Sequence, residues 1–218
     1  MKLIIADKNY SSWSMRPWVL MRHAAIPFDE VLVELDQPDT AARIRDYSPS
    51  GKVPCLVTDD GQAVWESLAI LETLAERYPD RPLWPSDAAA RAHARSIASE
   101  MHGGFAALRS SMPMNIRARS AGTGATPAAL ADVARIDALW SECLARYDGP
   151  FLFGATFGIA DAMYAPVVMR FNTYAPALSE AARAYAERVT ALPAVHAWID
   201  AAHGETHRIA KYEELIRT

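Results

Sequence analysis

The sequence predicts a small α/β domain followed by an all-α domain, and three observations support this fold class. Strand-like and helix-like segments alternate at the start of the chain, a proline-rich segment follows, and the remainder carries helical patterns without a convincing strand signal. With 218 residues the chain is long enough to bury a sizeable core. We therefore expect an α/β domain at 1–79, a linker at 80–87 and a helical domain at 88–218.

The first half of the α/β domain is expected to run strand, helix, strand. The segment "KLIIA", residues 2–6, is a short apolar run typical of a buried strand. Residues 16–25 have a helical pattern, and Pro17 is tolerated there because it falls in the first turn. The segment "FDEVLVEL", residues 28–35, alternates apolar and polar side chains as a half-buried strand does.

The second half of this domain is expected to run helix, strand, strand, helix. Residues 39–47, "DTAARIRDY", indicate a short helix. Residues 53–65, "VPCLVTDDGQAVW", indicate two strands joined by a turn at "DDG". Residues 67–78, "SLAILETLAERY", place leucines at helical spacing. The predicted order is β-α-β-α-β-β-α.

Three prolines in "PDRPLWPSD", residues 79–87, indicate the linker. Beyond it the only unusual feature of the first long helical pattern is the pair Gly103-Gly104, since each glycine costs a helix interior ~1 kcal/mol. The last residues, "HRIAKYEELIRT", are expected to form a polar tail. Helices are predicted at 88–111, 127–147, 159–174, 179–192 and 193–202.

Composition excludes several classes of function. The formal charge of −4 leaves no basic excess to hold a phosphate backbone, so nucleic acid is not an expected partner. The two cysteines, Cys55 and Cys143, form neither a metal-ligand pattern nor a disulfide framework, and no metal is expected. The N-terminal apolar run is too short for a signal peptide and no segment is long enough to span a bilayer. The expected location is the cytoplasm, with no membrane partner.

Three short segments carry candidate chemistry, and the first is "SGKVPCL". A proline directly before a strand marks an edge or a special geometry because proline cannot donate to a sheet ladder. A cis Val53-Pro54 bond would leave the Val53 backbone free to pair with an extended, peptide-like ligand. The alternative is an ordinary trans proline at the start of a strand.

The second segment is "WESLAI", in which Ser67 stands where a helix N-cap is expected. The start of a helix offers free N–H groups that suit a carboxylate, and Glu66 beside it suits an ammonium group. Together they would hold both charges of an amino-acid head group. The alternative is a plain cap with a solvated glutamate.

The third segment is "KNYSSWSMRPW", in which Ser11 and Ser12 lie between the first strand and the first helix. A hydroxyl at a helix start can donate to a bound thiolate, and such surroundings lower a thiol pKa. No histidine or aspartate nearby completes a hydrolase arrangement, so a serine nucleophile is not expected. The alternative is that these serines only cap the helix.

Taken together, the segments resemble the glutathione transferase superfamily over essentially the whole chain, with its thioredoxin-like N-terminal half. "SSWSMR" is similar to the family's active-site start, with a serine and an arginine five residues later. "SPSGKVPCL" resembles its Asn-Pro-x-Gly-x-Val-Pro-x-Leu segment, with Ser48 in place of Asn, and "ESLAI" matches its Glu/Gln-Ser-x-Ala-Ile segment. "FGIADAMYAPV" resembles its Ser/Thr-Ile-Ala-Asp capping box. There Gly158 replaces the hydroxyl residue, so we expect a weaker cap that keeps Asp161.

This resemblance implies roles in binding glutathione as a cosubstrate. Ser11 would donate to the glutathione sulfur, with Ser12 as the nearest rival. The serine-type start resembles the theta and zeta classes. Cys55 follows the proline, is expected to be a buried apolar residue, and argues against an omega-like disulfide mechanism. The other implied contacts are Val53 and cis Pro54 for the cysteinyl part, Glu66 and Ser67 for the γ-glutamyl end, and Lys52 for the glycine carboxylate.

The resemblance also places an electrophile pocket between the domains, against the first long helix. Met101, His102, Phe105 and Arg109 are candidates to line it, although the apolar members equally fit a helix core. If this face lines the pocket, the substrate is apolar, with an anionic group near Arg109.

The function implied is conjugation of glutathione to a small hydrophobic electrophile by a homodimeric transferase. Two alternatives remain open at this point. One is a glutathione-dependent cis-trans isomerase of the maleylacetoacetate isomerase type, because "SSWS" partly matches the zeta-class "SSCS". The other is a non-enzymatic protein that binds glutathione or hydrophobic ligands, since fold alone does not settle function.

Overall fold

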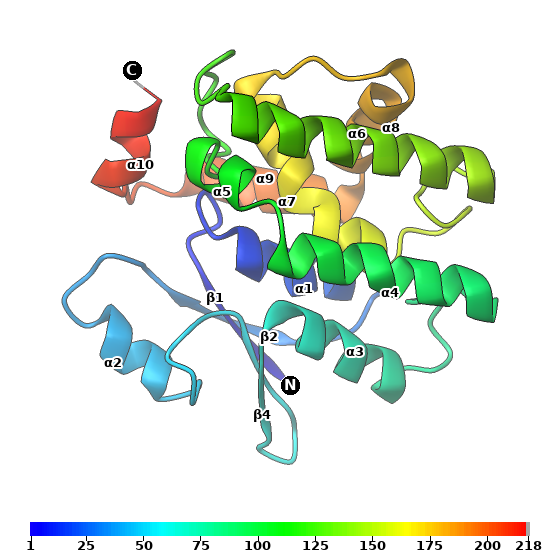
Figure 1. Ribbon diagram of the computed structural model, residues 1–218. Helices are drawn as coiled ribbons and strands as arrows, with labels where there is room; N and C mark the ends of the chain where they lie inside the picture. Colours follow the sequence, from blue (N-terminus) through cyan, green and yellow to red (C-terminus); the bar gives the residue numbers. More distant parts are fainter. Residues whose placement is uncertain (217–218) are drawn as a thin grey trace.

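The structure is a computed structural model that describes residues 1–216 (Figure 1). A four-stranded sheet in the order β2-β1-β3-β4 forms the centre of the N-terminal domain. Strands β1 (Lys2–Ala6) and β2 (Asp29–Val33) are parallel, whereas β3 (Cys55–Val57) and β4 (Ala63–Trp65) continue the sheet antiparallel. The predicted α/β domain is confirmed.

Three helices complete this domain in the predicted order: α1 (Ser12–His23), α2 (Thr40–Arg45) and α3 (Ser67–Arg77). Helices α1 and α3 lie between the sheet and the C-terminal domain, and α2 lies on the other face (Figure 1). Successive residues of β1 point to opposite faces of the sheet. Leu3 therefore joins the main core, whereas Ile4 packs with α2 in a smaller cluster.

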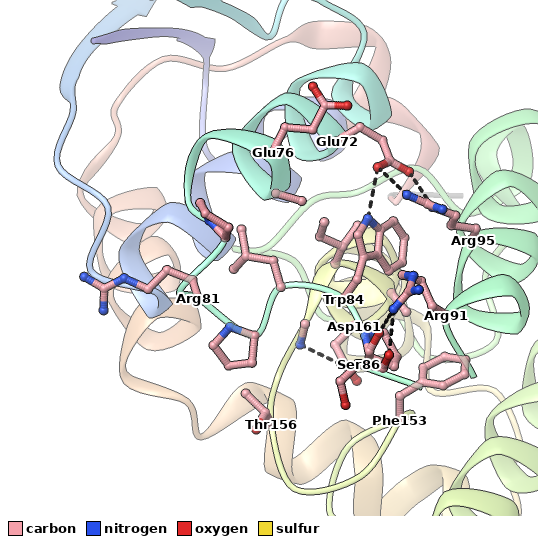
Figure 2. Close-up of a pocket in the computed structure, with 18 of the residues that line it drawn as sticks. Glu72, Glu76, Arg81, Trp84, Ser86, Arg91, Arg95, Phe153, Thr156 and Asp161 are labelled. Carbon is pink, nitrogen blue, oxygen red and sulfur yellow. Dashed lines mark hydrogen bonds and ion pairs between the residues drawn. The ribbon is translucent and has the colours of Figure 1, made fainter. Parts of the chain in front are cut away.

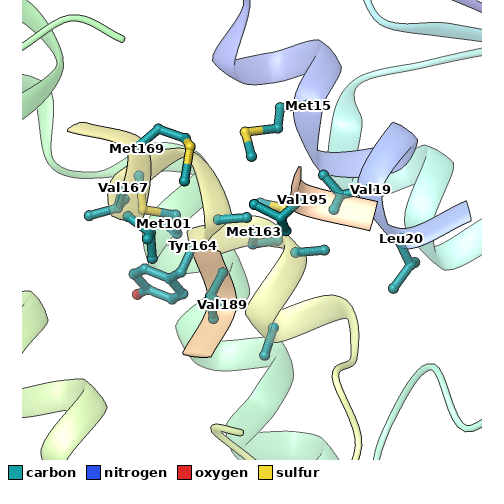
Figure 3. Packing of buried hydrophobic residues seen from close by; sticks show 14 of the residues in the cluster. Met15, Val19, Leu20, Met101, Met163, Tyr164, Val167, Met169, Val189 and Val195 are labelled. Carbon is teal, nitrogen blue, oxygen red and sulfur yellow. The ribbon is translucent and has the colours of Figure 1, made fainter. Parts of the chain in front are cut away.

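The C-terminal domain is all-α, as predicted, and α7 lies at its centre. Helices α1 and α4 both pack on α7, so this helix is a main part of the interface between the domains, where α1 also packs on α9 and α3 on α4. Figure 3 shows Met15 of α1 and Met101 of α4 beside Met163 of α7 in one apolar cluster. The helices are α4 (Ala88–Gly103), α5 (Ala106–Ser111), α6 (Pro127–Tyr147), α7 (Ile159–Tyr174), α8 (Glu180–Thr190), α9 (Pro193–Gly204) and α10 (Ala210–Leu215).

The continuous helix predicted at 88–111 is wrong, because the chain breaks after Gly103. Gly104 is extended, Phe105 has a left-handed φ of 58°, and α5 then begins in a new direction. A β-carbon on Gly104 would lie 2.7 Å from the Glu100 carbonyl oxygen, so only glycine fits this close approach. Arg109 then donates to the carbonyl of Gly104, which α4 leaves free.

The polar tail predicted at the C-terminus is also only partly right, because it contains α10 and is bound to the N-terminal domain. Glu205 accepts hydrogen bonds from the backbone N–H groups of Lys8 and Asn9, at 2.6 and 3.0 Å. Glu213 accepts from the Tyr10 hydroxyl at 2.6 Å. Glu213 and His207 of the predicted polar tail therefore bond Tyr10 and Asp7 of the β1–α1 loop, and Glu205, just before the tail, bonds the same loop. Residues 217–218 of that tail lie outside the described residues.

The capping box predicted at the start of α7 is present. Gly158 is the N-cap, and Asp161 accepts hydrogen bonds from the Gly158 and Leu152 N–H groups and from the Tyr185 hydroxyl, at 2.9, 3.0 and 2.9 Å. A β-carbon on Gly158 would lie 2.9 Å from the Leu83 carbonyl oxygen. Close packing against the linker therefore explains why glycine replaces the usual hydroxyl residue. Burial raises the pKa of Asp161 to about 6.

Candidate active site

The Val53-Pro54 peptide bond is cis, as the resemblance implies. Val53 is half-buried, Pro54 is buried, and the neighbouring Lys52 is exposed. Within residues 1–216 the Val53 backbone N–H and C=O make no hydrogen bond. The strand-like edge at this residue can therefore pair with an extended ligand.

The start of α3 lies opposite this edge. Because Cys55 pairs with Trp65 in the β3–β4 ladder, the residues just outside the two strands, Pro54 and Glu66, lie across from each other. The expectation that Ser67 is the N-cap is wrong: Glu66 is the N-cap and Ser67 is the first helical residue. A left-handed φ of 67° at Glu66 turns the chain from β4 into α3 without an intervening loop. Such strain in a residue other than glycine often marks a functional position.

The side chains at this helix start are held in different ways. Ser67 is buried, and its hydroxyl accepts a hydrogen bond from Arg16 Nη1 at 3.2 Å. The Glu66 carboxylate is half exposed and lies 3.5 Å from Nε2 of His102, which comes from α4 in the other domain. The first N–H groups of α3 face the same side with no partner inside the helix. The arrangement offers an anion site and a carboxylate next to each other.

Ser11 is the N-cap of α1, so its hydroxyl sits at the positive end of that helix. Its oxygen accepts from the Ser14 N–H at 3.4 Å, and its hydrogen is donated to Ser14 Oγ at 2.7 Å. Ser14 Oγ also accepts from the Ala6 N–H at 3.1 Å. The helix-cap interpretation of Ser11 is therefore confirmed, and this role leaves room for a second one, since a hydroxyl rotates easily.

Ser12 is placed differently from its neighbour. Its oxygen accepts a hydrogen bond from Nη2 of Arg170, on α7, at 3.2 Å. Within the described part of the chain, the Ser12 hydroxyl hydrogen has no protein acceptor. The Ser12 hydroxyl can therefore donate to a ligand while its oxygen accepts from the buried guanidinium of Arg170.

Cationic groups gather around Trp13, in the first turn of α1. The guanidinium carbons of Arg16 and Arg109 lie 4.3 and 4.6 Å from the centre of its ring, and the His102 ring lies edge-on at 5.3 Å. Several buried nitrogens of this group have no partner in the described structure: Arg16 Nε and Nη2, Arg109 Nη1 and His102 Nδ1.

Burial and mutual repulsion both act on this cluster. Burial lowers the pKa of Arg16 well below its usual value, and the charges of Arg109 and Arg170 lower it further. Burial also lowers the pKa of His102, with Arg16 adding to the effect. The carboxylate of Glu66 opposes this decrease of the pKa at both Arg16 and His102 without cancelling it. The cluster is therefore suited to an anion.

The four predicted pocket residues separate into two pairs. His102 and Arg109 are partly exposed and face the cluster around Trp13. Met101 is fully buried in the core, and Phe105 is buried at the break between α4 and α5. For these two the core interpretation is the one that fits.

Arg170 is the functional candidate that the sequence patterns missed. It is the one basic residue of a helix that is otherwise mostly apolar, and a basic residue inside such a run was the signal available. Tyr10, which directly precedes the serines, faces the tail instead. Its hydroxyl donates to Glu213 and accepts from Arg117 and from the Ile209 N–H.

Both cysteines are buried and unpaired. Burial raises the thiol pKa of Cys55 and takes that of Cys143 to about 12, so neither is a reactive thiolate. Residues 1–216 contain no group of three or more His, Cys, Asp or Glu side chains arranged to hold a metal ion. Within the same range, every helix is too short or too polar to cross a bilayer.

A groove of about 830 Å³ lies away from these residues, along the linker (Figure 2). Trp84 donates to Glu72 at 3.1 Å, and Arg95 bonds the same carboxylate from α4. None of the residues predicted to bind glutathione or an electrophile lines this groove.

The first domain is thioredoxin-like, has a cis proline at its open edge and is joined to a helical domain. This combination defines the glutathione transferase class of folds. Comparison with known proteins agrees. The family profile "Glutathione S-transferase, N-terminal domain" matches residues 10–77, and "Glutathione S-transferase, C-terminal domain" matches residues 115–201. The chain belongs to the glutathione S-transferase family and is an enzyme of that family.

Individual relatives agree with this assignment. The chain is 31% identical to a probable maleylacetoacetate isomerase of Caenorhabditis elegans. The alignment spans 168 residues, which is 77% of each protein. A sphingomonad glutathione S-transferase solved with glutathione is 26% identical, with a TM-score of 0.67 over 93% of this chain and 99% of that one. A zeta-class maleyl pyruvate isomerase in its holo form shares the fold, with a TM-score of 0.72 at 23% identity over 95% of this chain and all of that one.

Proposed function

We propose that this enzyme binds glutathione along the edge formed by Val53, cis Pro54 and the start of α3, with the sulfur at Ser11 and Ser12. The observation that carries the proposal is the convergence of these segments. Pro54 lies opposite Glu66 across the β3–β4 ladder, and Arg16 of α1 bonds Ser67. One extended tripeptide can therefore contact all of them.

Each part of glutathione has a chemically matched partner in this arrangement. The γ-glutamyl carboxylate meets the N–H groups of α3 and Ser67, and its ammonium group meets Glu66. The cysteinyl backbone pairs with Val53, as strands pair. The exposed Lys52 is placed to meet the glycine carboxylate. The thiolate lies at the positive end of α1, where hydroxyls and the helix dipole stabilise it.

For the second substrate we propose a small electrophile that carries a carboxylate near Arg109. The unpartnered nitrogens of Arg16, Arg109 and His102 around Trp13 support an anion in this position. Two reactions fit. One is conjugation of glutathione, as in detoxification. The other is cis-trans isomerisation of an unsaturated acid with glutathione regenerated, which the isomerase names of the relatives favour.

Consumption of glutathione separates the two reactions. The purified protein is first titrated with glutathione by calorimetry, and thiolate absorbance of the complex is then recorded against pH. Saturable binding with a thiol pKa below that of free glutathione is the expected result. Unsaturated acids and uncharged electrophiles are then compared. Turnover of an acid without loss of glutathione indicates isomerisation, and stoichiometric loss indicates conjugation. Absence of glutathione binding would overturn the proposal in favour of a ligand-binding protein.

Glu66→Gln is expected to raise the Kd of glutathione about tenfold, because it removes the charge that holds the ammonium group. Glutamine keeps the length and the same left-handed backbone, so the loss reports on charge. Glu72→Gln on the same helix is the matched control, since Glu72 bonds Trp84 and Arg95 outside the site. Calorimetry of the three proteins checks this. Equal Kd values for Glu66→Gln and the unaltered protein would contradict the assignment.

We also propose a cytoplasmic homodimer in which the first domain of one chain contacts the helical domain of the other. Two large apolar side chains support this arrangement: Trp65 on edge strand β4 is 43% exposed and Leu130 on α6 is 42% exposed. Two buried, unpaired cysteines are consistent with a reducing compartment.

Trp65→Ser is expected to weaken the dimer at least about tenfold, because burial of a large aromatic side chain stabilises an interface by several kcal/mol. Leu32→Ser is the control, since Leu32 is 37% exposed on β2 at the opposite edge of the sheet. Sedimentation equilibrium measures both. A dimer of unchanged affinity in Trp65→Ser would exclude this face from the interface.

A further inference from the structure

Arg170 is a buried cation without a carboxylate partner among the described residues. It is 4% exposed, and its guanidinium makes hydrogen bonds only to uncharged oxygens. Nε donates to the Met112 carbonyl at 3.0 Å, Nη1 to the Pro166 carbonyl at 3.2 Å, and Nη2 to Ser12 Oγ at 3.2 Å. Each of its three nitrogens thus has a hydrogen-bond partner, while its charge is not compensated.

The charged and titratable groups that face Arg170 do not supply the missing negative charge. Arg109 of α5 lowers its pKa by repulsion, in addition to the larger effect of burial. Arg170 in turn lowers the pKa of Arg16 on α1. The groups nearby that can become negative are the phenols of Tyr174 on α7 and Tyr212 on α10, and a phenol is neutral near pH 7.

A buried charge of this kind is costly unless an anion lies within its reach. Ser12 bonds Arg170 and is one of the two serines at which we propose that the sulfur lies, and within residues 1–216 its own hydroxyl hydrogen has no protein acceptor. A hydroxyl that accepts from a guanidinium becomes a stronger donor on its other side. In this arrangement Arg170 donates to Ser12 and Ser12 can donate to the sulfur, so both hydrogen bonds favour a negative charge on the sulfur.

We propose that Arg170 is a positioning residue that stabilises the thiolate of bound glutathione by holding and polarising Ser12. The inference rests on the proposed function, since it concerns the same sulfur. It adds a contribution from the centre of the helical domain to a thiol site built on the first domain. Ser11 and the dipole of α1 act on the sulfur from the helix end, and Ser12 acts through Arg170.

The test is the pKa of the glutathione thiol in the complex, followed by thiolate absorbance. Arg170→Met is expected to raise that pKa by about 1, which means about tenfold less thiolate at a pH below it. Arg170→Lys keeps the charge and is expected to recover part of the effect. In a Ser12→Ala background, Arg170→Met is expected to change the pKa by less than half as much, because the intermediate hydroxyl is gone.

Thr173→Val is the matched control for structural damage. Thr173 lies on the same helix and donates to the Asn115 carbonyl at 2.9 Å without contacting Ser12. Its replacement removes a buried hydrogen bond to the same 112–116 segment that Arg170 holds. We expect lower stability in urea and an unchanged pKa of the bound thiol.

The outcomes distinguish this inference from the proposed function. If Arg170→Met binds glutathione and its bound thiol titrates as in the unaltered protein, the role of Arg170 is wrong and glutathione binding stands. An equal rise of the pKa in Thr173→Val would assign the effect to loss of structure and would also overturn it. If the unaltered protein binds glutathione without lowering the thiol pKa, this inference fails and glutathione binding stands, whereas absence of binding overturns both.

Discussion

Ser11→Ala is expected to lower the turnover number about 100-fold, the usual cost of removing one donor from a developing or bound anion. The Kd of glutathione is expected to change less than about threefold, because most of the proposed binding contacts lie at Val53, Glu66 and Ser67. The physical reason is that Ser11 stands at the N-cap of α1, where its hydroxyl and the helix dipole act on the same sulfur. Steady-state kinetics and calorimetry on one preparation separate the two effects.

Ser12→Ala shows how the two hydroxyls divide this work. Ser11 now donates to Ser14, so its hydrogen must turn toward the sulfur, whereas the Ser12 hydrogen is already free. We still expect a smaller loss of turnover in Ser12→Ala than in Ser11→Ala, because Ser11 is the N-cap and lies closer to the positive end of the α1 dipole. Full activity in Ser11→Ala with a large loss in Ser12→Ala would reverse the assignment. Ser11→Ala also loses a helix cap, worth about 1 kcal/mol, which urea unfolding measures separately.

The second large effect is expected from Asp161→Ala, at the start of the central helix α7. The substitution leaves the N–H groups of Gly158 and Leu152 and the hydroxyl of Tyr185 without their acceptor in a fully buried place. Unsatisfied buried donors each cost about 1–3 kcal/mol. Near neutral pH we expect the free energy of unfolding to fall by about 3 kcal/mol, because relief of the buried charge offsets part of the loss.

This loss depends on pH in a defined direction. Burial raises the pKa of Asp161 to about 6 from its usual value of 3.8, so between these two pH values the folded protein keeps the proton while the unfolded chain releases it. The stabilising contribution is therefore complete below the unfolded pKa and is lost as the pH rises through the folded one. The difference between the unaltered protein and Asp161→Ala is expected to be about 2 kcal/mol larger near pH 4.5 than near pH 7.

Urea unfolding at several pH values tests both parts. Tyr185→Phe is the control, because it removes one donor to Asp161 and leaves the carboxyl group in place. It is expected to cost about 1 kcal/mol and to keep the pH dependence. A difference between the unaltered protein and Asp161→Ala that does not vary with pH would show that Asp161 titrates normally in the folded state.

The candidate site depends on three contacts between the two domains. His102 of α4 approaches Glu66, Arg109 of α5 stacks on Trp13, and Arg170 of α7 bonds Ser12. The residues proposed to bind glutathione come from the first domain, whereas His102, Arg109 and Arg170 come from the second and join Arg16 of α1 in the cationic cluster. Substrate choice is therefore expected to follow changes in the helical domain, whereas glutathione affinity follows the first domain.

Local patterns determined much of this protein. Alternation of apolar residues predicted the strand and helix order of the first domain, because pleated strands and helices repeat their faces at different periods. Short-range signals also located the proline edge, the start of α3 and the Asp161 capping box. Each of these depends on residues a few positions apart, so the sequence alone contains the necessary information.

Only the tertiary structure showed the features that depend on contacts between residues far apart in the sequence. The break at Gly104 depends on the Glu100 carbonyl oxygen, which would lie 2.7 Å from a β-carbon at this position. Helix α10 is held by the hydrogen bond between Glu213 and Tyr10, 203 positions earlier. The link from Arg170 to Ser12 spans 158 positions, and no periodicity connects them. Whether a buried charge is compensated depends on which groups packing brings within a few ångströms. The sequence therefore predicted the segments at which we propose that glutathione binds, and only the folded chain placed the Arg170 guanidinium against Ser12.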